Sequence, residues 1–172
     1  MKGVFLGRIC PLHLGHEAII EKMIETCGIE NCLVIIGGSN ATLSLRYFFS
    51  YAERRQFLRA VFPGIKVVGL PDFKEDNNQW FTALDDILTL GGFDPKEVRF
   101  FGGCEEDVEF FLEAGRKVSI VNRFDGSTPK ISATEVRDAL LQKRNLDGLL
   151  NPTIQQMVSE VFHRKWEAFK RM

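Results

Sequence analysis

The chain has 172 residues with 22 basic and 23 acidic side chains, so its formal net charge is −1. This length favours one domain with a sizeable core. The near-neutral charge gives no overall attraction to nucleic acid or to an anionic membrane. No apolar run approaches the roughly 20 residues that span a bilayer, and the apolar N-terminus breaks at Arg8, too early for a secretory signal. We therefore expect a cytoplasmic protein with no nucleic-acid or membrane partner.

The first half of the chain alternates short apolar runs with amphipathic stretches. It predicts strands over residues 3–6, 32–36 and 65–70 and a helix over residues 15–27. Between the second and third strands, Ser50 and Glu53 have the spacing of a capping box. A helix is therefore expected from Ser50 to about residue 62, where Pro63 and Gly64 end it.

The second half continues the alternation. A polar loop over residues 71–78 leads into a helix that contains the apolar residues at 83, 84, 87 and 88. Strands over residues 98–101 and 118–121 enclose a helix over residues 105–114. After a loop rich in turn formers, Ser132 and Glu135 predict a second capped helix. Asn151 and Pro152 begin a final helix to about residue 171, which we expect to be appended to a single domain over residues 1–172.

Five strands, each followed by a helix, predict an α/β fold with a five-stranded parallel sheet and helices on both faces. Ligands of such sheets bind beyond the carboxyl ends of the strands, near the point where the strand order reverses. The loop after the first strand usually lies at that point. In this chain it comprises residues 7–16.

That first loop contains the parts of a polyphosphate site. His13 and His16 are three residues apart, so near a helix start they can face the same side. We expect Gly7 to free the chain to turn, Pro11 to stiffen the loop, and Gly15 to admit a ligand close to the backbone. The helix N-terminus adds free N–H groups and partial positive charge. Taken alone, the pair is more often one surface and one core histidine.

The four cysteines include no C-x-x-C pair, which favours reduced thiols. Cys10, His13 and His16 have a compact spacing that zinc could use. However, no fourth ligand is obvious and the segment crosses from a loop into a helix. We therefore expect no metal site built from protein ligands.

The second constellation covers residues 131–137, which read Ile-Ser-Ala-Thr-Glu-Val-Arg. Ser132 is expected to cap a helix, with Thr134 in its first turn and Arg137 in the next. Hydroxyls, N–H groups and a guanidinium would then surround an anion-sized space. By itself the motif is more often an ordinary cap with an exposed arginine.

Together, the two motifs resemble the nucleotidyltransferase superfamily named for its H-x-G-H motif, whose second signature is I-S-x-T-x-x-R. Both signatures are matched in full. Within the superfamily the chain most resembles nicotinamide mononucleotide adenylyltransferases, namely the archaeal type and the domain fused to Nudix hydrolases in bacteria. The likeness includes a G-R-x-x-P-x-H-x-G-H opening over residues 7–16, the turn over residues 37–40 and the segment over residues 50–54 that ends in Glu-Arg. It also includes a loop with Asp72, Asn77, Asn78 and Trp80, whereas residues 42–49 align poorly.

The resemblance implies a Rossmann-like nucleotidyltransferase that transfers AMP from ATP to nicotinamide mononucleotide, giving NAD and pyrophosphate. It implies three groups of site residues. The catalytic residues are His13, His16 and Arg137, and the residues that bind ATP or its phosphates are Gly7, Arg8, Gly15, Ser132 and Thr134. The acceptor residues are Asp72, Asn78 and Trp80, where Trp80 either stacks on the pyridine ring or anchors its helix in the core. Mg²⁺ would accompany ATP, held by phosphate oxygens and water.

Two other functions remain open, as does a homo-oligomer. Pantetheine-phosphate adenylyltransferases, and other cytidylyltransferase-like enzymes, have similar end motifs. The former usually carry Thr at the position of His13. A catalytically silent module that senses a nucleotide is the alternative from another class, against which the intact His13, His16 and Arg137 count.

Overall fold

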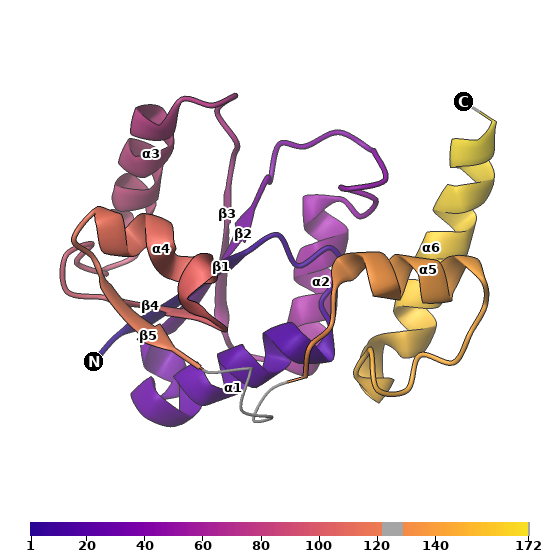
Figure 1. The fold of residues 1–172 in the computed structure, drawn as a ribbon, viewed down its shortest axis with the longest axis horizontal. Coiled ribbons are helices and arrows are strands. Elements are labelled where there is room, and N and C mark those ends of the chain that lie inside the picture. The colour runs from indigo at the N-terminus through magenta and orange to yellow at the C-terminus, as the bar shows by residue number, and fades with distance from the viewer. Residues whose placement is uncertain (122–128, 172) are drawn as a thin grey trace.

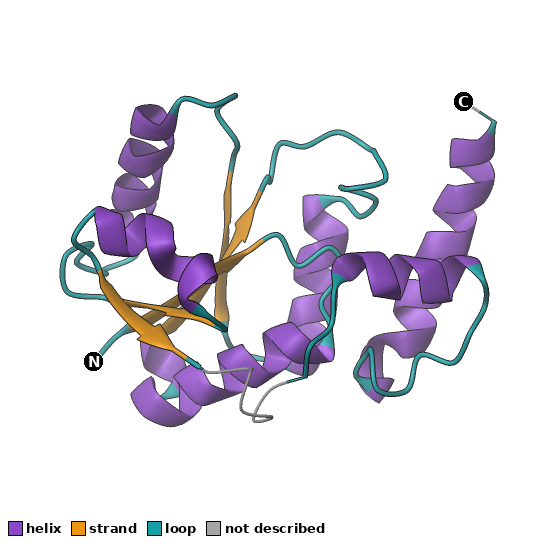
Figure 2. Cartoon of the chain, viewed as in Figure 1, coloured by secondary structure: helices purple, strands orange, loops and turns teal. Residues whose placement is uncertain are grey.

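The computed structural model of the protein describes residues 1–121 and 129–171. Its centre is one parallel sheet with the strand order β3-β2-β1-β4-β5. The strands are β1 (Gly3–Gly7), β2 (Cys32–Gly37), β3 (Lys66–Leu70), β4 (Arg99–Gly102) and β5 (Lys117–Ile120). Figure 2 shows all five between the helices. The predicted five-stranded parallel sheet is confirmed, with strand ends within one residue of those expected.

The helices also follow the predicted order. They are α1 (Leu14–Cys27), α2 (Tyr51–Val61), α3 (Asn77–Leu90), α4 (Glu105–Glu113), α5 (Ala133–Leu141) and α6 (Pro152–Lys170). A short 3₁₀ helix, η1 (Ile29–Asn31), was not expected. The predicted caps are present: Ser50 and Glu53 form a complete capping box, Ser132 accepts the N–H of Glu135, and Asn151 accepts that of Thr153.

Helices cover both faces of the sheet, as predicted (Figure 1). Neighbouring strand residues point to opposite faces, so Val4 and Phe5 of β1 belong to different clusters of buried side chains. The cluster around Phe5 includes buried residues of α1, α2, α5 and α6. The cluster around Val4 includes buried residues of α3 and α4. Apolar burial on both faces is what a parallel sheet requires.

The reversal of strand order falls at β1. From β1 the chain adds β2 and β3 on one side, then returns to add β4 and β5 on the other. The loop after β1 therefore lies at the switch point, where α/β sheets bind ligands. This confirms the expected position of the first motif.

The C-terminal helix α6 packs beside α2 and the loop before it. Lys165 donates to Glu53 at 2.6 Å, and Phe48 packs against Phe162 with 4.8 Å between ring centroids. Phe48 is fully buried. The poorly aligned segment over residues 42–49 is thus anchored by its last two residues under α6. Among the described residues, no helix has the length and apolar character of a membrane span.

Candidate active site

The first motif forms the start of α1 through its two imidazoles. His13 is the N-cap residue, and its Nδ1 accepts the backbone N–H groups of Gly15 at 3.1 Å and His16 at 3.4 Å. His16 reciprocates, since its Nδ1 accepts the N–H of His13 at 3.2 Å. Two histidines therefore build the capping box that Ser and Glu usually provide. The rings stack with centroids 3.6 Å apart, so the expectation that they face the same side is confirmed.

Gly15 has a different role from the one expected. A Cβ atom at Gly15 would lie 2.9 Å from Cε1 of His13 and 3.2 Å from the carbonyl oxygen of Pro129. The missing side chain therefore makes room for the cap imidazole itself. Gly15 also lines a cavity, which leaves the predicted close approach of a ligand open.

Gly7 likewise serves packing, which corrects the expectation that it frees the chain to turn. Its Cβ would lie 3.0 Å from the ring of Phe5, and its φ is not in the left-handed region. The residue that turns the loop through positive φ is Ile9, at 39°. This is an unusual conformation for a β-branched residue. Ile9 is only 1% exposed, so burial of its side chain holds the loop in this strained form.

Arg54 of α2 fastens the first loop to the end of β2. Its Nη1 donates to the carbonyl oxygens of Arg8 at 3.0 Å and Gly37 at 2.8 Å, and its Nη2 donates to that of Gly38 at 3.0 Å. The residue is 1% exposed, and burial lowers the pKa of its guanidinium. The buried fork therefore sets the distance between two strand ends at the switch point.

The second motif begins α5 and turns Arg137 back toward the first loop. Arg137 Nη1 donates to the carbonyl oxygen of Cys10 at 3.5 Å, and its Nη2 donates to Oγ1 of Thr134 at 3.4 Å. Ser132 Oγ accepts the N–H of Glu135 at 3.1 Å. Arg137 and Thr134 thus form one donor group, while Ser132 is engaged as the helix cap.

Two cavities join the motifs. The switch-point cavity, of about 440 Å³, lies between the ends of β1 and β4 and the helices α1 and α4, and contains His13, Gly15 and His16 in its wall. The Arg137 cavity, also about 440 Å³, is lined by Thr134 and Arg137. Arg8 and His16 line both. Residues more than 120 positions apart in the sequence therefore converge on one place.

A third cavity lies beyond the end of β3. This Trp80 cavity, of about 470 Å³, is lined by Asp72 and Trp80 and shares Arg8 and Arg46 with the Arg137 cavity. The amide in its wall is that of Asn77; Asn78, which we expected there, is not among the lining residues. The predicted acceptor loop thus faces the same edge of the sheet as the two motifs.

Trp80 has contacts that bear on both roles that the sequence left open. It lines the cavity and also packs in an aromatic cluster, with ring centroids 5.4 Å from Phe81 and 5.6 Å from Phe110. It is half-buried. One side of the indole therefore anchors α3 while the residue still borders the cavity.

Sequence reasoning missed three residues of this region, namely Arg46, Tyr47 and Arg54. Arg46 borders two cavities, and Tyr47 lies 5.6–5.9 Å from the guanidinium carbons of three arginines. All three residues belong to the segment before and within α2. The only sequence feature that pointed to any of them was the resemblance of residues 50–54, which end in Glu-Arg, and it predicted no role for Arg54.

The cysteines do not form a metal centre with the histidines. Cys10 donates its thiol to the carbonyl oxygen of Phe49 at 3.8 Å, and burial raises its pKa. All four cysteines are free thiols, as expected. Within residues 1–121 and 129–171, no group of three His, Cys, Asp or Glu side chains is arranged to hold a metal ion.

No family model matches the chain. Curated relatives do. The chain is 28% identical over 168 residues to the nicotinamide-nucleotide adenylyltransferase of Thermococcus sibiricus, covering 94% of this chain and 84% of that protein. It is 24% identical over 167 residues to the nicotinamide-nucleotide adenylyltransferase of Saccharolobus solfataricus, covering 93% and 91%. The predicted resemblance to H-x-G-H nucleotidyltransferases is confirmed.

Solved structures share the nucleotidyltransferase fold. A bifunctional NMN adenylyltransferase/ADP ribose pyrophosphatase from Francisella tularensis superposes with a TM-score of 0.69 at 16% identity, over 89% of this chain and 44% of that one. The NadR protein in complex with NAD and AMP-PNP gives a TM-score of 0.60 at 22% identity, over 90% and 46%. This chain thus spans less than half of those proteins. The predicted Rossmann-like fold class is confirmed.

Proposed function

We propose that this protein transfers AMP from ATP to nicotinamide mononucleotide, giving NAD and pyrophosphate. The observation that carries the proposal is the convergence of the two motifs on adjoining cavities that share Arg8 and His16. Near-complete alignment with nicotinamide-nucleotide adenylyltransferases supports the choice of substrates. The same alignment favours an enzyme over a silent sensor.

The reaction joins two phosphates. An oxygen of the acceptor phosphate forms a bond to the α-phosphorus of ATP. The bond between that phosphorus and the oxygen that bridges the α- and β-phosphates breaks. The leaving pyrophosphate keeps the electron pair of that bond. Negative charge accumulates on the transferring phosphate and the leaving group, so preorganised donors accelerate the step.

The residues of the two motifs are suited to that charge. His13 and His16 would contact the phosphates at the N-terminus of α1, where the helix dipole also favours an anion. Arg137 and Thr134 would hold the β- and γ-phosphates from α5, with help from Ser132. Gly7 and Gly15 would leave the ends of β1 and α1 accessible to ATP. The position of Arg137 in the wall of the same cavity as His16 supports this role.

Arg8 occupies the central position. It lines the switch-point, Arg137 and Trp80 cavities. An arginine at the junction of three cavities can contact the donor phosphates and the acceptor phosphate together, and so hold the two reactants in line. Asp72, Asn78 and Trp80 are proposed to hold the acceptor nucleotide, and Asn77 in the cavity wall joins them.

Mg²⁺ is proposed to accompany ATP. Arg8, Arg46 and Arg137 line the Arg137 cavity and Arg8 also lines the switch-point cavity, which suits phosphate rather than a bare cation. The metal would therefore be held by phosphate oxygens and water, and when bound it would neutralise charge on the triphosphate. A solved structure of the Francisella tularensis protein is complexed with AMP and a manganese ion.

Three further expectations stay proposals: that residues 1–172 act as one nucleotidyltransferase domain, that the protein is cytoplasmic, and that it forms a homo-oligomer. Of these, the homo-oligomer would affect the interpretation of activity if a second copy of the chain contributed residues to the site. Size measurement of the purified protein beside its activity tests the last of them.

A panel of acceptors tests the proposed reaction. The protein is incubated with Mg-ATP and nicotinamide mononucleotide, nicotinate mononucleotide or pantetheine phosphate, and the products are identified by mass while pyrophosphate is measured. We expect NAD and an equal amount of pyrophosphate. Arg137→Ala, which removes the α5 guanidinium, is the low-activity control. Adenylylation of pantetheine phosphate alone, or nucleotide binding without pyrophosphate release, would refute the proposal.

A further inference from the structure

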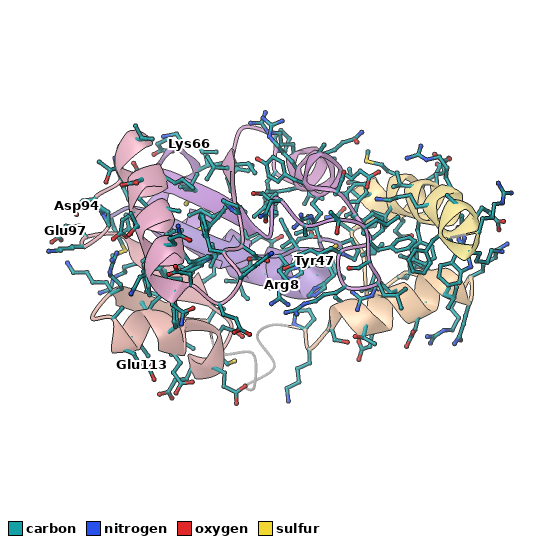
Figure 3. All side chains as sticks on the ribbon, turned by 90° about the horizontal axis from the view of Figure 1, so that it is seen from above. Arg8, Tyr47, Lys66, Asp94, Glu97 and Glu113 are labelled. Carbon is teal, nitrogen blue, oxygen red and sulfur yellow. The ribbon has the colours of Figure 1, made fainter. Side chains whose placement is uncertain are left out.

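Tyr47 lies where the loops after β1, β2 and β3 meet. It follows Arg46 in the connection between β2 and α2 and is half-buried. Figure 3 shows it beside Arg8. Gly38 makes room for the phenol: this glycine has φ +60°, and a Cβ there would lie 2.5 Å from the ring of Tyr47. The ring therefore occupies a space that the end of β2 keeps open.

The hydroxyl of Tyr47 fixes a carboxylate of the Trp80 cavity. It donates to Oδ2 of Asp72 at 3.1 Å. The main chain of Asp72 is already held by Asn40, which donates to its carbonyl oxygen at 3.1 Å and accepts its N–H at 2.9 Å. With the backbone fixed, the phenol decides which way the carboxylate faces. Burial raises the pKa of Tyr47, so the phenol remains a donor at neutral pH.

The ring of Tyr47 supports the arginines on its other side. The guanidinium carbons of Arg8, Arg46 and Arg54 lie 5.8, 5.9 and 5.6 Å from its centroid. An aromatic ring attracts cations, which offsets the repulsion among three like charges. Arg8 and Arg46 border both the Arg137 cavity and the Trp80 cavity. Tyr47 thus contacts three residues that line the Trp80 cavity: Asp72 through its hydroxyl, and Arg8 and Arg46 through its ring.

We propose that Tyr47 is a positioning residue that sets affinity for the acceptor nucleotide, by orienting Asp72 with its hydroxyl and Arg8 and Arg46 with its ring. The inference rests on the proposed function, because it takes the Trp80 cavity as the acceptor site. No group of Tyr47 itself lines that cavity among the described residues. Its effect on the acceptor must therefore pass through the residues that it holds.

Two substitutions separate the hydroxyl from the ring. Tyr47→Phe keeps the ring and loses the bond to Asp72. We expect KM for nicotinamide mononucleotide to rise roughly tenfold, the scale for losing one hydrogen bond to a charged group, with kcat and KM for ATP unchanged. Tyr47→Leu also loses the ring, so we expect it to lower kcat in addition, because Arg8 and Arg46 lose their support.

The controls use the same chemical change elsewhere. Tyr51→Phe alters the chain's only other tyrosine, and we expect its kinetic constants to match those of the wild type. A cycle with Asp72→Asn tests the route: once Asp72 is neutral, adding Tyr47→Phe should raise the acceptor KM little further. Melting temperatures of all variants are measured beside the kinetics.

The outcomes distinguish the inference from the function. If the wild type forms no NAD, the proposed function fails and the inference with it. If the wild type forms NAD and Tyr47→Phe has the wild-type KM for the acceptor, only the inference is overturned. Equal increases in both Michaelis constants, or additive effects of Tyr47→Phe and Asp72→Asn, would also overturn it, since a general structural role predicts them.

Discussion

The imidazoles of His13 and His16 are stacked, with 3.6 Å between ring centroids and 17° between their planes. The Nδ1 of each residue accepts the backbone N–H of the other. An Nδ1 that accepts a hydrogen bond carries no proton, so in the neutral form the proton of each ring is on Nε2. The capping box thus fixes the tautomer of both residues. Structure and chemistry are coupled here, because the groups proposed to bind phosphate also begin the helix.

The first prediction separates these two roles of His16. Gln at the N3 position of a capping box can accept the N-cap N–H, so His16→Gln should keep the cap and lose the imidazole. We expect a melting temperature near that of the wild type and a kcat lowered by about two orders of magnitude, the scale for a lost charge-stabilising donor. Thermal unfolding and steady-state kinetics measure both.

His16→Ala is the companion variant. It should show the same loss of turnover and also lose about 0.5–1.5 kcal/mol of stability, the usual contribution of one hydrogen bond, because the N–H of His13 loses its acceptor. Near-normal turnover in a folded His16→Gln would eliminate the proposed role of the imidazole.

The second prediction concerns Arg54. Arg54→Leu leaves the carbonyl oxygens of Arg8, Gly37 and Gly38 without their donor. Each orphaned buried acceptor costs about 1–3 kcal/mol, so we expect several kcal/mol of lost stability in urea unfolding and little residual activity. Arg59→Leu, on the exposed side of the same helix, should stay within about 0.5 kcal/mol. Equal stability of the two variants would contradict the bracing role of Arg54.

Sequence patterns predicted the elements well because burial imposes their period. Strands buried on both faces read as continuous apolar runs, and each helix carries an apolar stripe, so the strand ends and most helix ends fall within one residue of those observed. The start of α3 lies two residues before the expected one. The first motif was located correctly for the same reason: once β1 is assigned, its following loop lies at the switch point. The caps at Ser50 and Ser132 needed only local spacing.

The functional details depend on contacts between distant segments. Arg54 binds a carbonyl oxygen 46 residues away, which no local pattern reveals. Gly7 and Gly15 make room for the neighbouring rings of Phe5 and His13, a packing role that the local sequence does not reveal. Which of the adjacent residues Asn77 and Asn78 lines the Trp80 cavity depends on where α3 begins. We expected the loop to continue to Asn78, whereas the helix starts at Asn77.

Glu17 gives the third prediction. This residue of α1 is 2% exposed; Asn151 donates to its Oε1 at 2.8 Å, and its Oε2 has no hydrogen-bond partner within residues 1–121 and 129–171. Burial raises its pKa. The folded protein therefore binds this proton more tightly than the unfolded chain does. The resulting stabilisation is complete below the ordinary carboxyl pKa and is lost as pH rises through the folded-state pKa.

Glu17→Gln should remove that pH dependence. Relative to the wild type, the variant should become progressively more stable between about pH 4 and about pH 8, because only the wild type must release this buried proton as pH rises. Urea unfolding at both pH values measures the difference. Glu25→Gln, which makes the same substitution at an exposed position of α1, is the matched control. A Glu17→Gln variant that loses stability relative to wild type as pH rises would reverse the sign and disprove the argument.

The last prediction tests Trp80, whose indole borders the proposed acceptor cavity and packs against Phe81 and Phe110. Trp80→Leu retains an apolar side chain but removes the ring that can stack on a cationic pyridinium. We expect KM for nicotinamide mononucleotide to rise several-fold to about tenfold, equivalent to about 1 kcal/mol, while KM for ATP stays constant. Trp166→Leu changes the chain's other tryptophan, in the α6 aromatic cluster, and should lower the melting temperature without altering either constant. If Trp80→Leu lowered the melting temperature and left the acceptor KM unchanged, Trp80 would be a core anchor only, because stacking on the acceptor requires a change in that constant.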